Sequence, residues 1–426
     1  MAITLFVIPF VLLLLGFPVF IVLLTGLTAT LIFVSHVPLT ALHQNLFGTI
    51  DSFSLLAVPF FIYAGELMGR GSVAQRLVDF VQEGVGNVRG GLAVTTVGTS
   101  AIFGAISGVS AACVATVGKV MFPAMRRAGY PEPFAAGLVT AVGAIDIIIP
   151  PSVPLIVYGS AASESVPQLY AAGIFPGLLL AVLLAIYVMG RAHIGGFGKG
   201  SAFNLKRFLH ATGRGIWALG APVIILGGIY GGFFSPTESA AVACVYAALV
   251  TKFVFRELGW RDIVESARVT VLFTAQILII VACAGVFAWL LTINQVPTQI
   301  VAWIQTMNIP VWALLLIINV ALLVVGCFLD GISAILLLSP LLVPVIKSVG
   351  INPVHFGIIM TVNLAIGLFH PPFGINIFVA QSVLGIKLEP IYRGIIPFMG
   401  VYLVALALIT YFPMISLSGV RLLLGR

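Results

Sequence analysis

Long apolar runs separated by short polar or glycine-rich links make up almost the whole chain. A helix needs about 20 predominantly apolar residues to cross the hydrocarbon core of a bilayer. Seven runs approach or exceed that length, at roughly 3–34, 52–69, 168–190, 216–233, 239–255, 269–292 and 392–417. The pattern therefore predicts seven ordinary membrane-spanning helices, with an amphipathic link after the second.

Two further stretches consist of paired, shorter apolar arms. In 91–122 the arms flank Ser107-Gly108-Val109-Ser110, and in 310–346 they flank Asp330-Gly331-Ile332-Ser333. Arms of this kind are short for a full crossing. We therefore expect two re-entrant helical hairpins whose tips lie inside the membrane. For the first stretch the alternative is one long helix packed through its small residues.

An internal repeat contains these hairpins. A shift of 221 residues aligns Pro150-Pro151 with Pro371-Pro372 without a gap, and repeats of this kind define an architecture. Each proline pair interrupts an apolar run, at 134–165 and 354–386, because proline lacks an N–H and clashes with the preceding turn. In lipid the freed carbonyls need partners, and a repeated broken helix indicates the binding site of a carrier.

Five crossings separate the two hairpins: one broken helix and four ordinary spans. Because five is odd, the second hairpin enters from the opposite face. We therefore predict an all-α polytopic membrane protein with inverted repeats, each containing a re-entrant helical hairpin and a broken helix. The predicted units are 1–88 (scaffold spans and amphipathic link), 89–165 (first repeat), 166–308 (scaffold spans), 309–386 (second repeat) and 387–426 (last span).

Composition supports the same class of protein. Hydrophobic residues make up 61% of the chain and charged residues 8%, and the mean hydropathy is +1.20. This leaves too little polar surface to cover a soluble globule of 426 residues. The net charge of +7 would suggest nucleic-acid binding in a soluble protein. Here we attribute it to basic cytoplasmic loops and expect no nucleic-acid partner.

The distribution of basic residues indicates the orientation. On the predicted topology one face collects 16 of the 20 Lys and Arg residues, including Lys199. The other face has Lys347, Arg421 and Arg426, and Lys119 lies in a hairpin arm. By the positive-inside rule the basic face is cytoplasmic. We therefore expect the amino terminus inside and the carboxyl terminus outside.

Polar residues at the hairpin tips and helix breaks are the candidates for binding a solute. Small residues let the backbone approach an ion or solute, unwound carbonyls can coordinate Na⁺, and half-helix amino termini favour an anion. The candidate substrate-binding residues are Ser107, Gly108, Ser110, Ser152, Gly331, Ser333, Asn363, His370 and Asn376. Helix packing is the alternative role for any single serine. The four cysteines and six histidines show no disulfide or metal-ligand spacing.

Three acids and one histidine each allow two interpretations. Asp146 either binds a cation or caps the second half-helix, and Asp330 either contributes to binding or caps the second hairpin arm. Glu238 follows a turn signal at a helix start, where a capping role is favoured. His370 is either a packed, buried histidine or a proton-coupling group.

The chain resembles the large membrane (M, DctM-like) subunit of TRAP transporters, the tripartite ATP-independent periplasmic carriers for organic acids. Six stretches in family order carry the resemblance: Leu56-Ala57-Val58-Pro59-Phe60-Phe61 with Ala64-Gly65-Glu66-Leu67-Met68, Ile106-Ser107-Gly108, Ile149-Pro150-Pro151-Ser152, Phe234-Ser235-Pro236-Thr237-Glu238, Phe328-Leu329-Asp330-Gly331, and Pro371-Pro372-Phe373-Gly374. They run through nearly the whole length of the chain.

The resemblance implies an elevator-type secondary carrier of the bacterial inner membrane, driven by Na⁺. Both hairpins and both broken helices would form a transport domain that slides against a scaffold of the other spans. A periplasmic binding protein would deliver a carboxylate, and a separate small membrane subunit of about four spans would complete an unfused permease. Family sodium ligands would fall on Ser107, Val109, Asp146, Ile148 and Pro151 (site 1), and by repeat symmetry on Phe328, Asp330, Gly367, Phe369 and Pro372 (site 2).

Three departures from the family pattern bear on ion binding. The family often has serine where Val109 stands, glycine where Asp146 stands and threonine where His370 stands. A proton could therefore replace one sodium. The alternative function is a stand-alone Na⁺- or H⁺-coupled dicarboxylate carrier that works without a binding protein. An intramembrane protease is disfavoured because Ser107 and His370 lack a third group to orient the histidine, and Asp146 and Asp330 lack the flanking motifs of an aspartyl protease.

Overall fold

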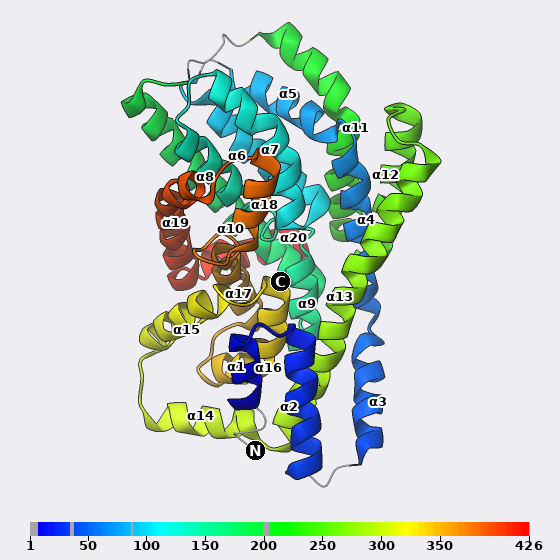
Figure 1. The fold of residues 1–426 in the computed structure, drawn as a ribbon, viewed down its shortest axis with the longest axis vertical. Helices are drawn as coiled ribbons and strands as arrows, with labels where there is room; N and C mark the ends of the chain where they lie inside the picture. Colours follow the sequence, from blue (N-terminus) through cyan, green and yellow to red (C-terminus); the bar gives the residue numbers. More distant parts are fainter. Residues whose placement is uncertain (1–6, 35–37, 87, 199–203, 426) are drawn as a thin grey trace.

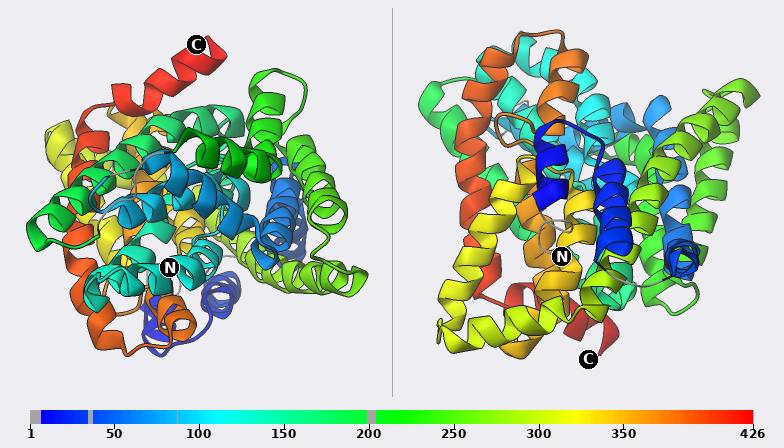
Figure 2. Two further views of the ribbon diagram at one scale, coloured as in Figure 1. Left: turned by 90° about the horizontal axis from the view of Figure 1, so that it is seen from above. Right: turned by 60° about the horizontal axis from the view of Figure 1, so that its bottom comes forward.

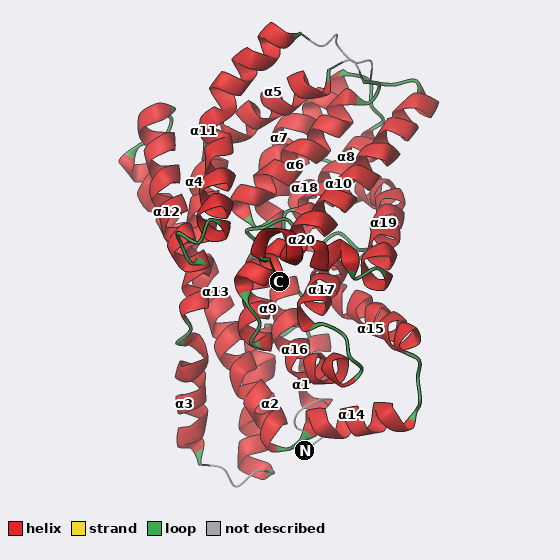
Figure 3. Ribbon diagram, turned by 180° about the vertical axis from the view of Figure 1, so that it is seen from behind, coloured by secondary structure: helices red, strands yellow, loops and turns green. Residues whose placement is uncertain are grey.

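The computed structural model describes residues 7–34, 38–86, 88–198 and 204–425. Lys199 and Arg426, two of the basic residues counted above, lie outside these ranges. Every regular element in the described ranges is a helix (Figure 3). The predicted all-α fold is therefore confirmed.

The helices of the first half lead to the first break and the span after it (Figure 1). They are α1 (Ile8–Leu14), α2 (Val19–Phe33), α3 (Leu39–Ile50), the 3₁₀ turn η2 (Phe53–Leu56), α4 (Ala57–Arg70), α5 (Val73–Val85), α6 (Gly91–Ser107), α7 (Ser110–Arg127), α8 (Glu132–Val142), the 3₁₀ turn η3 (Gly143–Ile145), α9 (Val153–Ala162) and α10 (Val166–Gly195).

The second half repeats this order after two connecting spans. Its elements are α11 (Leu205–Tyr230), α12 (Pro236–Leu249), the π-helical turn η4 (Val250–Val254), α13 (Trp260–Ile293), α14 (Val296–Thr306), α15 (Val311–Gly326), α16 (Gly331–Ser348), α17 (Pro353–Gly367), α18 (Ile375–Leu384), α19 (Leu388–Tyr411) and α20 (Met414–Leu424).

Most of the predicted spans correspond to single long helices. Helices α10, α11, α12 with η4, α13 and α19 are long and apolar enough to cross a bilayer. The predicted span at 52–69 is α4, which forms one bent unit with α3 at an angle of 57°. Helix α16 is also long enough to cross, so length alone does not identify it as a re-entrant arm.

The single span expected at 3–34 is wrong. Helix α1 ends at Leu14, and the chain reverses through Gly16, whose φ is +81°, and Pro18 before α2 begins. Helices α1 and α2 pack against each other as an antiparallel pair (Figures 1 and 2). Glycine readily adopts the positive φ of such a reversal, and proline then starts the next helix.

The internal repeat extends beyond the stretch where sequence similarity is evident. The 221-residue shift places α6 to α9 on α15 to α18, and it also places α5 on α14. Helices α5 and α14 lie at opposite ends of the molecule (Figure 1). The packing is reciprocal, because α7 lies against α18 and α9 against α16, while α8 lies against α19 and α17 against α10. An inverted repeat produces this arrangement.

The two hairpins differ in their packing. Helices α6 and α7 lie side by side, whereas α17 packs against both α15 and α16, which touch each other only slightly. The first hairpin is therefore a close helical pair and the second is splayed around the broken helix of its own repeat. The break at Gly108 and Val109 excludes the alternative of one continuous helix over 91–122.

One glutamate joins two inter-helix links at one end of the bundle. Glu257, in the link before α13, accepts hydrogen bonds from the amide and hydroxyl of Ser72 and lies 3.2 Å from the Arg76 guanidinium. Burial raises the pKa of Glu257, but these hydrogen bonds and the Arg76 charge outweigh burial and hold that pKa below its ordinary value. The link before α13 is thereby fixed to the start of α5.

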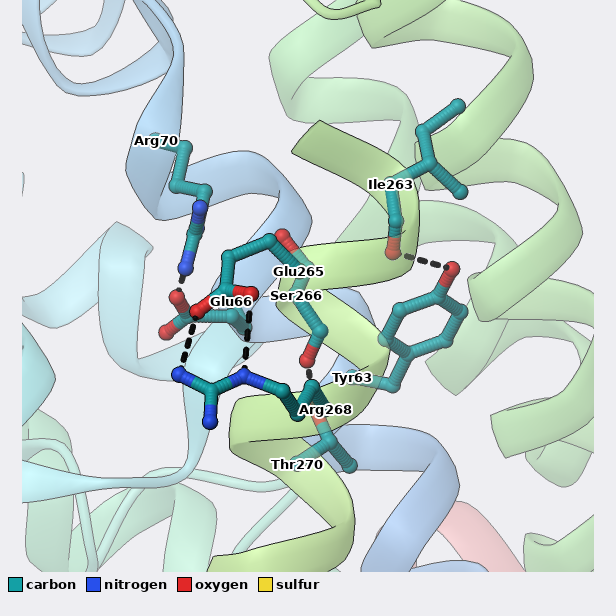
Figure 4. Close-up of polar contacts among 8 residues, drawn as sticks. All are labelled: Tyr63, Glu66, Arg70, Ile263, Glu265, Ser266, Arg268 and Thr270. Atoms are coloured by element: carbon teal, nitrogen blue, oxygen red, sulfur yellow. Dashed lines mark hydrogen bonds and ion pairs between the residues drawn. The ribbon is translucent and has the colours of Figure 1, made fainter. Parts of the chain in front are cut away.

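Helices α4 and α13 cross at the same end (Figure 4). Tyr63 of α4 donates a hydrogen bond to the Ile263 carbonyl of α13, at 3.2 Å. Each helix also carries its own ion pair, Glu66 with Arg70 and Glu265 with Arg268. The Tyr63 hydrogen bond joins the two helices that precede α5 and α14, and each ion pair stays within its own helix.

Candidate functional site

Both hairpin tips and both helix breaks converge on one cavity of about 100 Å³. The lining residues come from the first tip (Gly108, Val109, Ser110, Ala111), the first break (Ile147, Val153, Pro154), the second tip (Asp330, Gly331, Ile332) and the second break (Leu368, Ile375), with Phe273 from α13. The repeat pattern in the sequence predicts this convergence of tips and breaks. Phe273 carries no sequence signal that would have identified it.

Glycine at position 108 allows the first tip to sit directly on the first break. Gly108 has φ +62°, in the left-handed region, and Val109 is extended, so the chain reverses within two residues. A Cβ on Gly108 would lie 2.6 Å from the Pro151 carbonyl oxygen, too close for any other residue. Helix α4 approaches the same tip, because a Cβ on Gly65 would lie 2.9 Å from the Cα of Ser107.

Proline interrupts the helix at the first break, and a serine caps the helix that follows it. The Pro150-Pro151 peptide is cis, and no helix continues through residues 146–152. The Ser152 hydroxyl accepts a hydrogen bond from the Leu155 amide at the start of α9 and donates one to the Ile147 carbonyl. Ser152, a predicted substrate residue, therefore caps α9.

Asp146 lies fully buried in this break, and neither carboxylate oxygen has a well-formed hydrogen bond. A Cβ on Gly104 of α6 would come within 2.6 Å of its Oδ1, and the nearest donors are the Ser107 hydroxyl and the amides of Gly108 and Val109. A buried charge without a partner is strongly destabilising. The side chain therefore fits either a bound cation or a proton, and it does not cap α9, because Ser152 does.

Further ligands for such a cation would have to be main-chain or hydroxyl oxygens. Among the described residues no group of three His, Cys, Asp or Glu side chains is placed to hold a metal ion. Of the predicted site 1 atoms, the Pro151 carbonyl faces the first tip at Gly108, whereas the Ile148 carbonyl lies against Gly173 of α10. Main-chain and carboxylate oxygens are the ligands that hard cations prefer.

The second tip contacts the second break through side chains and backbone atoms that differ from those at the first tip. The Cys327 Sγ lies 3.0 Å from His370 Nδ1, and the rings of Phe328 and Phe373 are 6.0 Å apart. A Cβ on Gly367 would lie 2.4 Å from the Gly326 carbonyl oxygen, so the two helix ends meet backbone to backbone. His370 is half-buried and paired.

Asp330 is a helix cap. Its carboxylate accepts hydrogen bonds from the amides of Ile332 and Ser333, each at 3.1 Å, and from the Ser333 hydroxyl. The capping interpretations of Asp330 and of Glu238, which forms a capping box with Ser235, are both confirmed. Two carbonyls of predicted site 2 already have donors: Tyr392 donates to Pro372 at 3.0 Å, and the His370 amide donates to Gly367 at 3.3 Å.

Asn376 joins the two repeats, and Asn363 does not reach the cavity. Asn376 Nδ2 donates to the Ser110 hydroxyl at 2.8 Å and to the Thr140 carbonyl at 3.3 Å. Asn363 instead donates to Asn319 of α15 at 2.8 Å, and Asn319 donates to Thr410 of α19 at 3.0 Å. Both side chains are buried, but only Asn376 bears on the cavity, through Ser110.

Comparisons with known proteins give a matching family model and several sequence relatives. The family model described as "Tripartite ATP-independent periplasmic transporter, DctM component" matches residues 6–415. The chain is 41% identical over 406 residues to the isethionate TRAP transporter permease protein DctMQ of Oleidesulfovibrio alaskensis, covering 94% of this chain and 64% of that protein. It is 40% identical over 399 residues to the C4-dicarboxylate TRAP transporter large permease protein DctM of Pseudomonas aeruginosa, covering 93% and 92%.

A third relative and a solved structure extend the comparison. The 2,3-diketo-L-gulonate TRAP transporter large permease protein YiaN of Escherichia coli is 36% identical over 374 residues, covering 87% of each chain. The crystal structure of the Alcanivorax borkumensis YdaH transporter superposes with a TM-score of 0.64 at 16% identity, covering 88% of this chain and 87% of that one. At that identity the likeness concerns the fold alone.

Proposed function

The chain belongs to the DctM component family of tripartite ATP-independent periplasmic transporters, and we propose that it is the large permease subunit of a Na⁺-coupled secondary carrier for an organic acid. The curated relatives are named for isethionate, C4-dicarboxylates, ectoine and 2,3-diketo-L-gulonate. Small organic acids are thus the substrate class, and we propose no enzymatic activity.

The observation that carries this proposal is the convergence of four helix amino termini on the cavity. Ser110, Val153, Gly331 and Ile375 are the first residues of α7, α9, α16 and α18, and all four line it. A helix amino terminus carries partial positive charge and N–H groups without an intrahelical partner. Ser152 and Asp330 already cap α9 and α16, so α7 and α18 offer amides without a side-chain cap. No basic side chain is among the described residues that line the cavity. An anion would therefore be recognised by backbone dipoles.

Asp146 supports coupling to a cation. The cavity lies beside the buried carboxylate through the shared tip residues Gly108 and Val109. A Na⁺ ion would neutralise that carboxylate and favour the nearby anion. The proposed ligands are Ser107, Val109, Asp146, Ile148 and Pro151 for the first ion and Phe328, Asp330, Gly367, Phe369 and Pro372 for the second.

We propose an elevator movement for transport. The two hairpins and the two broken helices would move as one transport domain, and α4 and α13 would belong to the scaffold. The close approach of Gly65 to Ser107 and the position of Phe273 at the cavity support this division, because both bring scaffold helices against the tips.

The partners and the orientation follow from the family and the charge distribution. A small membrane subunit and a periplasmic binding protein would complete the transporter in the bacterial inner membrane. The end of the bundle that carries Arg70, Arg76 and Arg268 would face the cytoplasm. Lys347 would then lie at the periplasmic end, as would α14.

Uptake into proteoliposomes tests the proposal. The vesicles would contain this chain and its small subunit, with the binding protein and a radiolabelled carboxylate outside, under an imposed Na⁺ or H⁺ gradient. Uptake that requires both Na⁺ and the binding protein supports the tripartite carrier. Uptake without the binding protein would identify the alternative, a stand-alone carrier, and uptake driven by H⁺ alone would refute the coupling ion.

A further inference from the structure

A second and larger cavity, of about 710 Å³, opens at the proposed periplasmic end. One wall is formed by α16 and the other by the end of α13 and the start of α14, with the end of α9 beneath. We call it the outer cleft. Its volume lies in the range of small-molecule sites, and the right-hand view of Figure 2 brings this end of the molecule forward.

The outer cleft and the central cavity are the two ends of one seam between α13 and α16. On α13, Phe273 lines the cavity and Ala288 and Thr292 line the cleft. Between them Ile277, Val281 and Ala284 follow at helical spacing on the same face, and all three are buried. The same packed helix pair therefore separates the two spaces.

Helix α16 shows the matching pattern. Ile332 lines the cavity at its start, Leu336 is buried, and Ser339, Val343 and Lys347 line the cleft. These positions again recur every three or four residues, which places them along one face. A solute that enters the cleft thus stands at the outer edge of the seam that closes the cavity.

Lys347 places a positive charge at this entrance. Its Nζ lies 2.9 Å from the Glu164 carboxylate, and the lysine side chain is 49% exposed to solvent. The repeat-equivalent residue at the opposite end, Arg126, instead bonds to Tyr130 and Glu132 just after its own helix. Lys347 therefore differs from its counterpart in reaching across to another repeat and into a cleft.

We infer that the outer cleft is the entry site for the substrate and that Lys347 is the counter-ion that first holds the carboxylate before it reaches the cavity. The inference rests on the proposed function. An arriving carboxylate replaces Glu164 as the partner of Lys347, which is an exchange between like groups. An exposed ion pair contributes little to stability, so such an exchange is readily reversible.

The first test compares two ways of breaking the same ion pair. Lys347→Gln and Glu164→Gln both remove it, but only Lys347→Gln removes the charge that holds the substrate. In the complete proteoliposome system, we expect Lys347→Gln to raise the half-saturating concentration of substrate-loaded binding protein about three- to tenfold, with the maximal rate unchanged. Lys347→Arg and the control Arg421→Gln should behave like the wild type, whereas Glu164→Gln removes the competing carboxylate and should lower the half-saturating concentration. Equal effects of Lys347→Gln and Glu164→Gln, or none from either, would overturn the inference.

The second test begins with a thiol-protection measurement that needs neither an ion gradient nor the binding protein. In Ser348→Cys, which keeps Lys347 and lines the same cleft, a carboxylate substrate should slow modification of the new thiol by a methanethiosulfonate reagent. The half-exposed Cys327, labelled in the unsubstituted chain, gives the background. In Lys347→Cys, measured by uptake in the complete proteoliposome system, a cationic methanethiosulfonate reagent should restore the half-saturating concentration and an anionic reagent should not. If both reagents act alike and substrate gives no protection, the inference is wrong although uptake by the unsubstituted chain still supports the proposed function.

Discussion

Replacing Asp146 by asparagine should make the protein more stable without Na⁺ and less responsive to Na⁺. The carboxylate is fully buried and neither oxygen has a well-formed hydrogen bond. An unpaired buried charge costs several kcal/mol, whereas an unpaired buried amide costs about 1–3 kcal/mol. In Na⁺-free solution, at a pH where the buried carboxyl group is ionised, the Asp146→Asn variant should therefore exceed the wild type by about 2 kcal/mol.

The Na⁺ response follows from binding linkage. At a Na⁺ concentration of about 100 times the dissociation constant, the wild type gains about 2.7 kcal/mol. A variant that binds Na⁺ about tenfold more weakly gains about 1.4 kcal/mol at the same concentration. The sodium-dependent gain should therefore fall to about half.

Thermal unfolding in detergent measures both quantities, in NaCl and in choline chloride of equal ionic strength. The matched control is Glu132→Gln, which removes a carboxylate from the same broken helix at a position that is 38% exposed. That control should respond to Na⁺ like the wild type. If Asp146→Asn also keeps the full Na⁺ response, the carboxylate does not bind the ion, and the reasoning from its burial is refuted.

Three further predictions concern packing and charge. Gly394→Ala should destabilise the protein by about 1–3 kcal/mol or more, because its Cβ would lie 1.9 Å from a carbonyl oxygen of α8, whereas Gly400→Ala on the same helix has open space and should be neutral in thermal unfolding. Ser110→Ala and Asn376→Ala, measured singly and together, should show a coupling energy of about 0.6–1.5 kcal/mol; additive effects would mean that the cross-repeat hydrogen bond contributes nothing. The pKa of Glu257 is lowered by folding, so its stabilisation is full above about pH 5 and is lost as the pH falls through the folded pKa; the stability difference between wild type and Glu257→Gln should shrink towards zero below about pH 4, and a constant difference would contradict it.

The sequence predicts the breaks and tips well because their signals are local. A proline pair cannot continue a helix, and glycine at position 108 has the left-handed φ that a two-residue tip requires. The caps at Asp330 and Ser235 follow from residue type and position alone. Each of these features depends on a few neighbouring residues, so one sequence is enough to identify it.

Features that depend on helix rotation or chain reversal are harder to predict. The run at 3–34 is uniformly apolar, so hydropathy does not reveal the turn at Gly16. Helix α13 is apolar on most faces, and nothing in its sequence shows that Phe273 faces the cavity. The 221-residue shift locates Asn363 beside a break but does not say which way its side chain points.

The separation between the cavity and Lys347 has a physical reason in an elevator. A lysine or arginine fixed inside the cavity would have to cross the low-dielectric membrane unpaired whenever the carrier returned empty, and an unpaired charge there is strongly disfavoured. Helix amino termini attract an anion through dipoles that belong to the backbone and leave no net charge to carry. A full positive charge is tolerated on the moving domain where it stays exposed and paired, and Lys347, which lies at the entrance and would move together with its partner Glu164, meets both conditions. On this argument, moving a lysine from the cleft to the cavity, by combining Lys347→Gln with Gly331→Lys, should increase binding of the anion at equilibrium and slow its transport.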